Sequence, residues 1–111
     1  MEQNSARYGV VLVTTASQAE GEAIAKALLA EKLAACVNIM PVHSFYTWQG
    51  KQQSDREWQL IIKTNLTLFS QLAVKIKELH SYEVPEIIAL PIIAGSESYL
   101  SWLDGNVKQN Q

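Results

Sequence analysis

Two side chains in this sequence, Cys36 and His80, are of the types that bind soft or borderline transition-metal ions. Each also has an ordinary structural interpretation, because a buried free cysteine packs as a small hydrophobe and a histidine at a helix end can interact with the last carbonyls. His43 has no second donor nearby in the sequence and is interpreted as an edge residue. No Cys-x-x-Cys, His-x-His or His-Glu-x-x-His spacing is present, so a metal site would need ligands from distant segments or separate chains.

A second group of reactive side chains lies between Tyr82 and Glu86, where a phenol and two carboxylates flank Pro85. Glu86 could pair with a cation such as Lys63, or serve as a ligand or general acid, and a solvated turn is the competing interpretation. Lys63 either extends to solvent or is partly buried opposite a carboxylate. No Ser-His-Asp order, glycine-rich phosphate loop or nucleophile elbow is visible, so no motif supports catalysis.

These side chains have to be positioned by two long strand-like runs separated by a polar turn at residues 49–55. Trp58, Leu60 and Ile62 fall on one face of the second run, with the period of two that is typical of a strand. Pro41 cannot donate to a sheet ladder, so we expect a bend or bulge there. Strands longer than ~6 residues would overhang so small a domain, so we expect the tip to pair with another copy of the chain.

The remaining elements follow from periodicity and capping signals. We expect a buried strand at residues 8–15, followed by a helix that a Ser17–Glu20 capping box opens and that ends near Lys32. After the hairpin we expect a second helix, capped by Asn65 or Thr67 and ending near His80, whose apolar stripe contains Phe69, Leu72, Ile76 and Leu79. A strand at 87–93 and a short helix at 97–104 complete the order.

This order predicts an α+β protein, a ferredoxin-like βαββαβ sandwich with a long hairpin between its second and third strands and a C-terminal helix. We expect one domain at residues 7–105, a disordered tail at 1–6 and a polar tail at 106–111. The helices would cover the face that holds Leu60. The opposite face, with Ile61 and Lys63, would lie bare, and together with the overhanging hairpin it favours self-association into a closed ring.

Composition narrows the function classes. A chain of 111 residues fits one domain, and a net charge of −2 argues against a nucleic-acid partner. Residues 57–60 also lack the basic and aromatic series of an RNA-recognition strand, which excludes that domain despite its identical element order. A single cysteine excludes an internal disulfide. No signal peptide or apolar run of ~18 residues is visible, so we expect a cytoplasmic protein without a membrane anchor.

Five short motifs follow one another along almost the whole chain: KLAACVNI at residues 32–39, YTWQG at 46–50, Glu57 with Leu60 and Lys63-Thr64, HSYEVPEI at 80–87 and YLSW at 99–102. In this order they resemble the CutA divalent-cation tolerance family. The resemblance implies a ferredoxin-like fold and a homotrimer similar in architecture to PII signalling proteins. It also implies a role in tolerance to copper and other divalent ions, with no established catalytic activity and no obligatory cofactor.

The resemblance also assigns individual residues. It implies metal contact, with copper or another divalent cation, for Cys36 and His80. It places further residues near clefts between subunits: Trp48, Glu57, Lys63, Tyr82, Glu86 and Trp102. The family usually has proline after the histidine, whereas this chain has Ser81, and we expect the missing proline to free the backbone and alter how His80 is presented.

Three functions remain open. The first is a homotrimeric metal-responsive protein that holds copper or a similar ion weakly where chains meet. The second is a PII-like trimeric scaffold whose cleft between subunits binds a small molecule or a partner protein. The third is a small enzyme with Glu86 as the acid and Lys63 as its partner, which would require a strongly perturbed carboxyl group.

Overall fold

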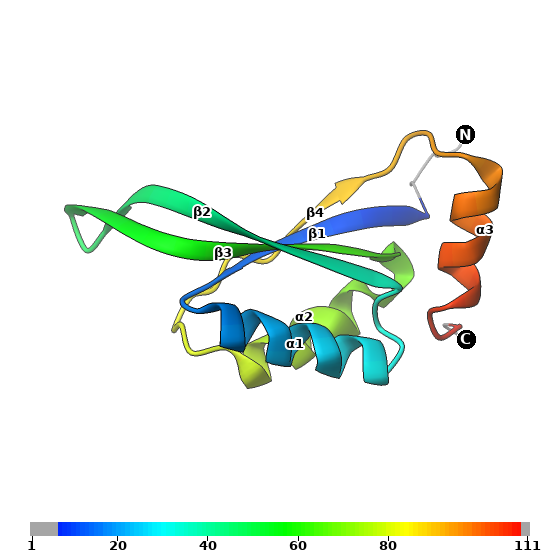
Figure 1. The fold of residues 1–111 in the computed structure, drawn as a ribbon, viewed down its shortest axis with the longest axis horizontal. Helices are drawn as coiled ribbons and strands as arrows, with labels where there is room; N and C mark the ends of the chain where they lie inside the picture. The colour runs from blue at the N-terminus through cyan, green and yellow to red at the C-terminus, as the bar shows by residue number, and fades with distance from the viewer. Residues whose placement is uncertain (1–6, 110–111) are drawn as a thin grey trace.

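The computed structural model describes residues 7–109 as a four-stranded antiparallel sheet in the order β2-β3-β1-β4 (Figure 1). Its elements are β1 (Tyr8–Thr15), α1 (Gln18–Ala30), β2 (Cys36–Trp48), β3 (Lys51–Asn65), a 3-10 turn η1 (Leu66–Leu68), α2 (Phe69–Leu79), β4 (Ile88–Pro91) and α3 (Glu97–Gly105). This order confirms the predicted α+β, ferredoxin-like fold with a long hairpin and a C-terminal helix. Figure 1 shows α1 and α2 on one face of the sheet and α3 at the end opposite the hairpin tip.

α1 starts at the predicted capping signal, but one hydrogen bond of the capping box is displaced by one residue. Ser17 Oγ accepts a hydrogen bond from the amide of Glu20 at 3.1 Å. The Glu20 carboxylate reaches back to the amide of Ala16 at 3.3 Å, one residue before the cap itself. The helix ends at Ala30, slightly before the predicted end, because Lys32 adopts the left-handed conformation with φ 57°.

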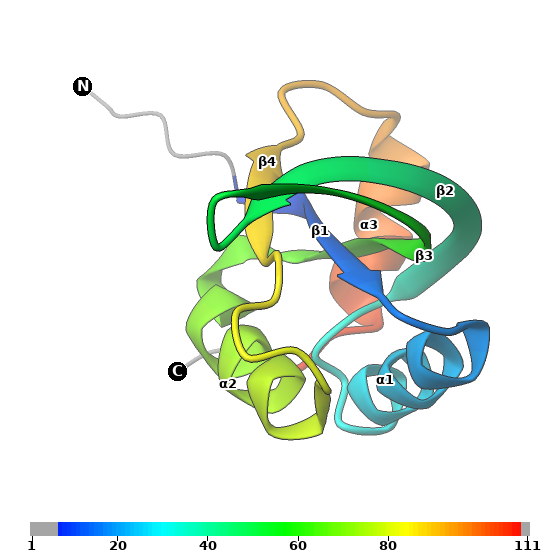
Figure 2. The same cartoon turned by 90° about the vertical axis from the view of Figure 1, so that its left-hand side faces the viewer.

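The hairpin is more regular than predicted. Gln49 and Gly50 have φ values of 53° and 79°, which form a two-residue turn of the primed type. β3 therefore starts at Lys51, and the polar turn predicted at residues 49–55 is wrong. The bulge predicted at Pro41 is absent, because Pro41 pairs with Trp58 in an unbroken register. β2 is an edge strand, which tolerates the missing amide, and the hairpin coils smoothly in Figure 2.

The core lies between the sheet and the first two helices. As predicted, Leu60 and Ile62 face the helices, and both are fully buried. They belong to one cluster with side chains from β1, α1 and α2, including Val11, Val13, Ile24, Leu28, Leu72 and Ile76. Leu79, predicted on the inner stripe of α2, is 42% exposed because it is the last residue of the helix.

The last strand is shorter than predicted, and the packed region of the chain extends further toward the C-terminus than predicted. β4 covers Ile88–Pro91 only and pairs with β1 alone. Beyond α3, Val107 is 4% exposed within the core, and the amide of Lys108 donates to the carbonyl of Lys32 at 2.8 Å. Residues 107 and 108 are therefore tied to the domain. The tail predicted at residues 1–6 lies outside the described residues, and no helix within 7–109 is long and apolar enough to span a membrane.

Half of the hairpin overhangs the rest of the sheet. β1 pairs with β3 from Trp58 to Asn65, whereas residues 51–57 pair only with β2. The overhang carries exposed aromatic side chains, with Phe45 at 75%, Tyr46 at 41% and Trp48 at 42%. This part of the structure confirms the predicted overhang.

Candidate functional site

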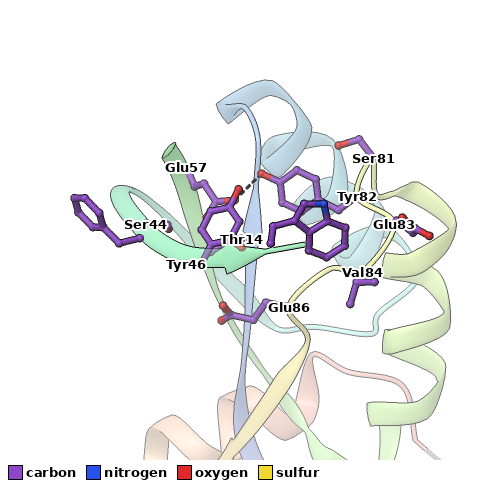
Figure 3. A pocket seen from close by; sticks show the side chains of 11 residues that line it. Thr14, Ser44, Tyr46, Glu57, Ser81, Tyr82, Glu83, Val84 and Glu86 are labelled. Carbon is purple, nitrogen blue, oxygen red and sulfur yellow. Dashed lines mark hydrogen bonds between the residues drawn. The ribbon is translucent and has the colours of Figure 1, made fainter. Parts of the chain in front are cut away.

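A pocket of about 630 Å³ lies where the overhang meets the loop between α2 and β4 (Figure 3). β2 and β3 supply one wall and residues 81–86 supply the other. The lining residues are Thr14, Ser44, Phe45, Tyr46, Trp48, Glu57, Ser81, Tyr82, Glu83, Val84 and Glu86. Alternation along a strand explains why Ser44, Tyr46 and Trp48 share one face of β2.

A buried carboxylate forms the floor of this site. Glu57 is only 5% exposed, and its Oε2 accepts a hydrogen bond from the Tyr82 hydroxyl at 2.5 Å. Burial, together with this hydrogen bond and the nearby negative charge, raises the pKa of Tyr82 well above its ordinary value. Tyr82 therefore keeps its proton and serves as a donor to Glu57.

His80 orients Tyr82 rather than facing the pocket. Its Nε2 donates to the carbonyl of Thr14 at 2.7 Å, and its Nδ1 accepts from the amide of Tyr82 at 3.0 Å. The side chain is fully buried. Both ring nitrogens are engaged in this conformation, so His80 could bind a metal ion only after giving up one of these bonds. Its role as a metal ligand stays a prediction.

The loop after His80 is held to α1 by Glu20. Glu20 Oε2 accepts from the amide of Ser81 at 2.7 Å, and Oε1 accepts from the Ser81 hydroxyl at 3.1 Å. Burial acts to raise the pKa of Glu20, but these hydrogen bonds outweigh it and hold the pKa below its ordinary value. The expectation that Ser81 frees the backbone is wrong: proline would have no amide to donate, whereas Ser81 is bound twice.

Cys36 lies at the other end of the sheet, where β2 begins. It pairs in register with Lys63, which pairs in turn with Val10. The Thr14 carbonyl that holds His80 is four residues further along β1, about 13 Å at the usual strand rise. One chain therefore does not bring Cys36 and His80 together, and within residues 7–109 no group of three His, Cys, Asp or Glu side chains could hold a metal ion.

The same end of the sheet contains two more predicted site residues. Lys63 Nζ donates to Asn38 Oδ1 at 2.6 Å, so its partner in the structure is Asn38 and the pairing with Glu86 is not observed. Trp102 packs on Tyr99 with ring centroids 5.5 Å apart. Burial, reinforced by Cys36 nearby, raises the pKa of Tyr99.

The structure thus divides the predicted cleft residues into two groups. Trp48, Glu57, Tyr82 and Glu86 line the same pocket, whereas Lys63 and Trp102 lie outside it (Figure 3). Sequence reasoning had not assigned Thr14, Ser44 or Tyr46 to the site, although it had grouped Glu83 with Tyr82 and Glu86. The period of two that relates Ser44, Tyr46 and Trp48 was the available signal for the β2 wall.

An antiparallel sheet in the order β2-β3-β1-β4, with two helices on one face and an extended hairpin, defines a ferredoxin-like α+β protein. The family model described as CutA1 divalent ion tolerance protein matches residues 9–106, and the chain belongs to this family. The resemblance found in the sequence is confirmed.

Individual relatives agree with this assignment. The chain is 50% identical over 98 residues to a divalent-cation tolerance protein CutA of Thermus thermophilus, covering 87% of this chain and 95% of that one. It is 48% identical over 100 residues to a chloroplastic CutA of Arabidopsis thaliana, covering 89% of this chain and only 55% of the plant protein. A crystal structure of CutA1 from Oryza sativa superposes with a TM-score of 0.91 at 44% identity, covering 96% of this chain and 98% of that one.

Proposed function

We propose that this protein serves in tolerance to divalent cations as a homotrimer, holding copper or a similar ion weakly where chains meet. Relatives named for divalent-cation tolerance at 50% and 42% identity support the cation role. The proposal concerns binding and assigns no reaction to the chain. A cytoplasmic location belongs to the proposal as well.

The observation that carries the proposal is the apolar surface that a single chain leaves uncovered. Ile93 is 92% exposed, Phe45 is 75% exposed, and Ile88 and Leu90 are about half exposed at 50% and 49%. These side chains lie on the overhanging hairpin and on or just after the edge strand β4. Burial of apolar surface contributes roughly 25 cal/mol per Å², and pairing of β4 and the hairpin with sister chains would supply it.

Assembly would also explain why residues 7–109 of one chain contain no cluster of metal ligands. No single chain gathers three suitable ligands within residues 7–109, whereas a closed ring brings equivalent segments of several chains together. Cys36 fits this role, because the residue is only half-buried and sulfur prefers copper to magnesium. His80 would have to release either Thr14 or Tyr82 to join it.

The test has two parts. Light scattering over a hundredfold dilution should give about three times the chain mass of 12.4 kDa. Copper titration should then show weaker binding in Cys36→Ala and His80→Ala than in the control His43→Ala, whose ring contacts exposed Ser54. A well-folded single chain at every concentration would overturn the trimer. Equal copper binding by all three variants would remove Cys36 and His80 as ligands.

A second candidate function is a PII-like trimeric scaffold that binds a small molecule or partner protein in a cleft between subunits. The pocket at Glu57 and Tyr82 favours it, because 630 Å³ lies within the range of about 300 to 1,000 Å³ typical of small-molecule sites. Stabilisation by organic ligands and none by metal ions in a thermal-shift screen would select this function over the first.

A further inference from the structure

We propose that the pocket at Glu57 and Tyr82 binds a linear aliphatic amine that carries two or more ammonium groups. The inference goes beyond tolerance to metal ions, and it depends on the side chains of this pocket alone.

The pocket is acidic without a compensating base. Three carboxylates line it, those of Glu57, Glu83 and Glu86, and none of its lining residues is lysine, arginine or histidine. Asp55 stands beside it and accepts a hydrogen bond from the hydroxyl of Tyr46, which is a lining residue. Such a concentration of one charge in a concave site favours a cationic ligand.

Glu57 supplies the strongest reason to expect an occupant. Its carboxylate is buried to 5% exposure, yet within the described residues it accepts one hydrogen bond, from Tyr82 at Oε2. Its Oε1 has no hydrogen-bond donor among residues 7–109. A buried carboxylate oxygen without a donor costs free energy, and an ammonium N–H placed in the pocket would supply the missing bond.

The spacing of the acids argues against a bare metal ion. Glu57 comes from β3, whereas Glu83 and Glu86 come from the middle and the end of the loop, and the three form no group that could hold a metal. Figure 3 shows the Glu86 side chain set apart from the Glu57–Tyr82 contact. A cation that spans the pocket with separate ammonium groups can reach carboxylates that one small ion cannot chelate.

The aromatic walls suit the carbon chain of such a ligand. Tyr46, Trp48 and Tyr82 all line the pocket, and aromatic faces attract ammonium groups and cover methylene chains. The raised pKa values of Tyr46 and Tyr82, caused first by the Asp55 hydrogen bond and by burial respectively, are consistent with the negative surroundings. Both phenols remain neutral donors to their carboxylates.

Isothermal titration of the full chain with spermidine tests the inference. We expect saturable binding by the wild type and binding about fivefold weaker in each of Glu83→Gln and Glu86→Gln, which remove exposed carboxylates of the pocket. Glu97→Gln removes an exposed carboxylate at the start of α3 and should leave the affinity unchanged. Tetramethylammonium, with one charge, should bind more weakly than spermidine.

Glu57→Gln should weaken spermidine more than the other variants, and circular dichroism will show whether it stays folded. If Glu57→Gln does not fold, Glu83→Gln and Glu86→Gln still test the inference. Absence of spermidine binding, or an equal loss in Glu97→Gln and Glu86→Gln, would overturn the inference. Neither result would decide the copper titration, because neither Cys36 nor His80 lines the pocket.

Discussion

The two halves of the hairpin contain the same kind of side chain in opposite surroundings. Residues 58–63 of β3 pair on both sides and bury Leu60 and Ile62 completely, whereas residues 51–57 pair only with β2, which carries exposed aromatics such as Phe45. A single chain therefore buries side chains of the first half and leaves those of the second half exposed. The pocket lies at the boundary between them, where Glu57 is the last residue that pairs with β2 alone before β1 joins at Trp58.

The largest effect is expected from the doubly paired half. Leu60→Ala should lower the free energy of unfolding by about 2 to 5 kcal/mol, because it removes a fully buried side chain and leaves a cavity. Urea unfolding at fixed chain concentration measures it. Phe45→Ala is the matched variant in the overhang, and it should act on association, so its effect should grow on dilution. An equal and dilution-independent loss in both variants would break the comparison.

A smaller effect is expected where the two halves meet. Tyr82→Phe should cost about 1 to 3 kcal/mol, because it leaves the buried Glu57 carboxylate without its donor. Tyr46→Phe is the control: it removes the same kind of bond, to Asp55, on the exposed overhang, and should change little. Urea unfolding at pH 7 compares them. If Tyr46→Phe cost as much as Tyr82→Phe, Glu57 would not be distinguished by its burial.

The turn at the hairpin tip is the third point of comparison. Gly50→Ala should cost about 1 to 2 kcal/mol, since φ is 79° there and a side chain strains that conformation although the space is open. Gly105→Ala, at the end of α3 and equally open, has no positive φ and should be neutral or slightly stabilising. Thermal unfolding of both variants measures the contrast. Equal effects would show that the turn geometry does not constrain the overhang.

The faces of the doubly paired half and the start of the helix that covers it were predictable, because both depend on local sequence signals. The period of two identified the faces of β3, and Ser17 identified the start of α1. The turn was misplaced because Gln49 occupies a left-handed position that asparagine or aspartate more often fills. The bulge at Pro41 was wrong because edge position, which excuses the missing amide, is a property of the whole sheet.

The candidate site was only partly predictable. Tyr82 reaches Glu57 across 25 residues of sequence, and His80 reaches Thr14 across 66, so no local pattern could pair them. The motifs that carried the family resemblance did include Trp48, Glu57, Tyr82 and Glu86. They could not separate these from Lys63 and Trp102, because that separation follows from strand register for Lys63 and from the placement of α3 for Trp102.

The smallest effect concerns Glu20, which holds the Ser81 loop against the paired half. Its folded pKa lies below the ordinary value of 4.5, so its contribution to stability is present above pH 4.5 and is lost as pH falls through the folded pKa. Glu20→Gln should therefore lower the free energy of unfolding by less than about 1 kcal/mol at pH 7, with the gap closing below pH 4.5. Urea unfolding at several pH values measures this gap.

Glu22→Gln removes a carboxylate from the same helix without touching Ser81, and its gap at pH 7 should be smaller than that at Glu20. Ser81→Pro is the sharper variant, because it deletes the amide that donates to Glu20 while keeping the residue before Tyr82 rigid. It should reproduce the pH-dependent gap of Glu20→Gln. If the difference in unfolding free energy between wild type and Glu20→Gln stayed unchanged down to pH 3, the charge of Glu20 would not hold the loop. The hydrogen bonds of His80 would then be what orders the loop wall of the pocket.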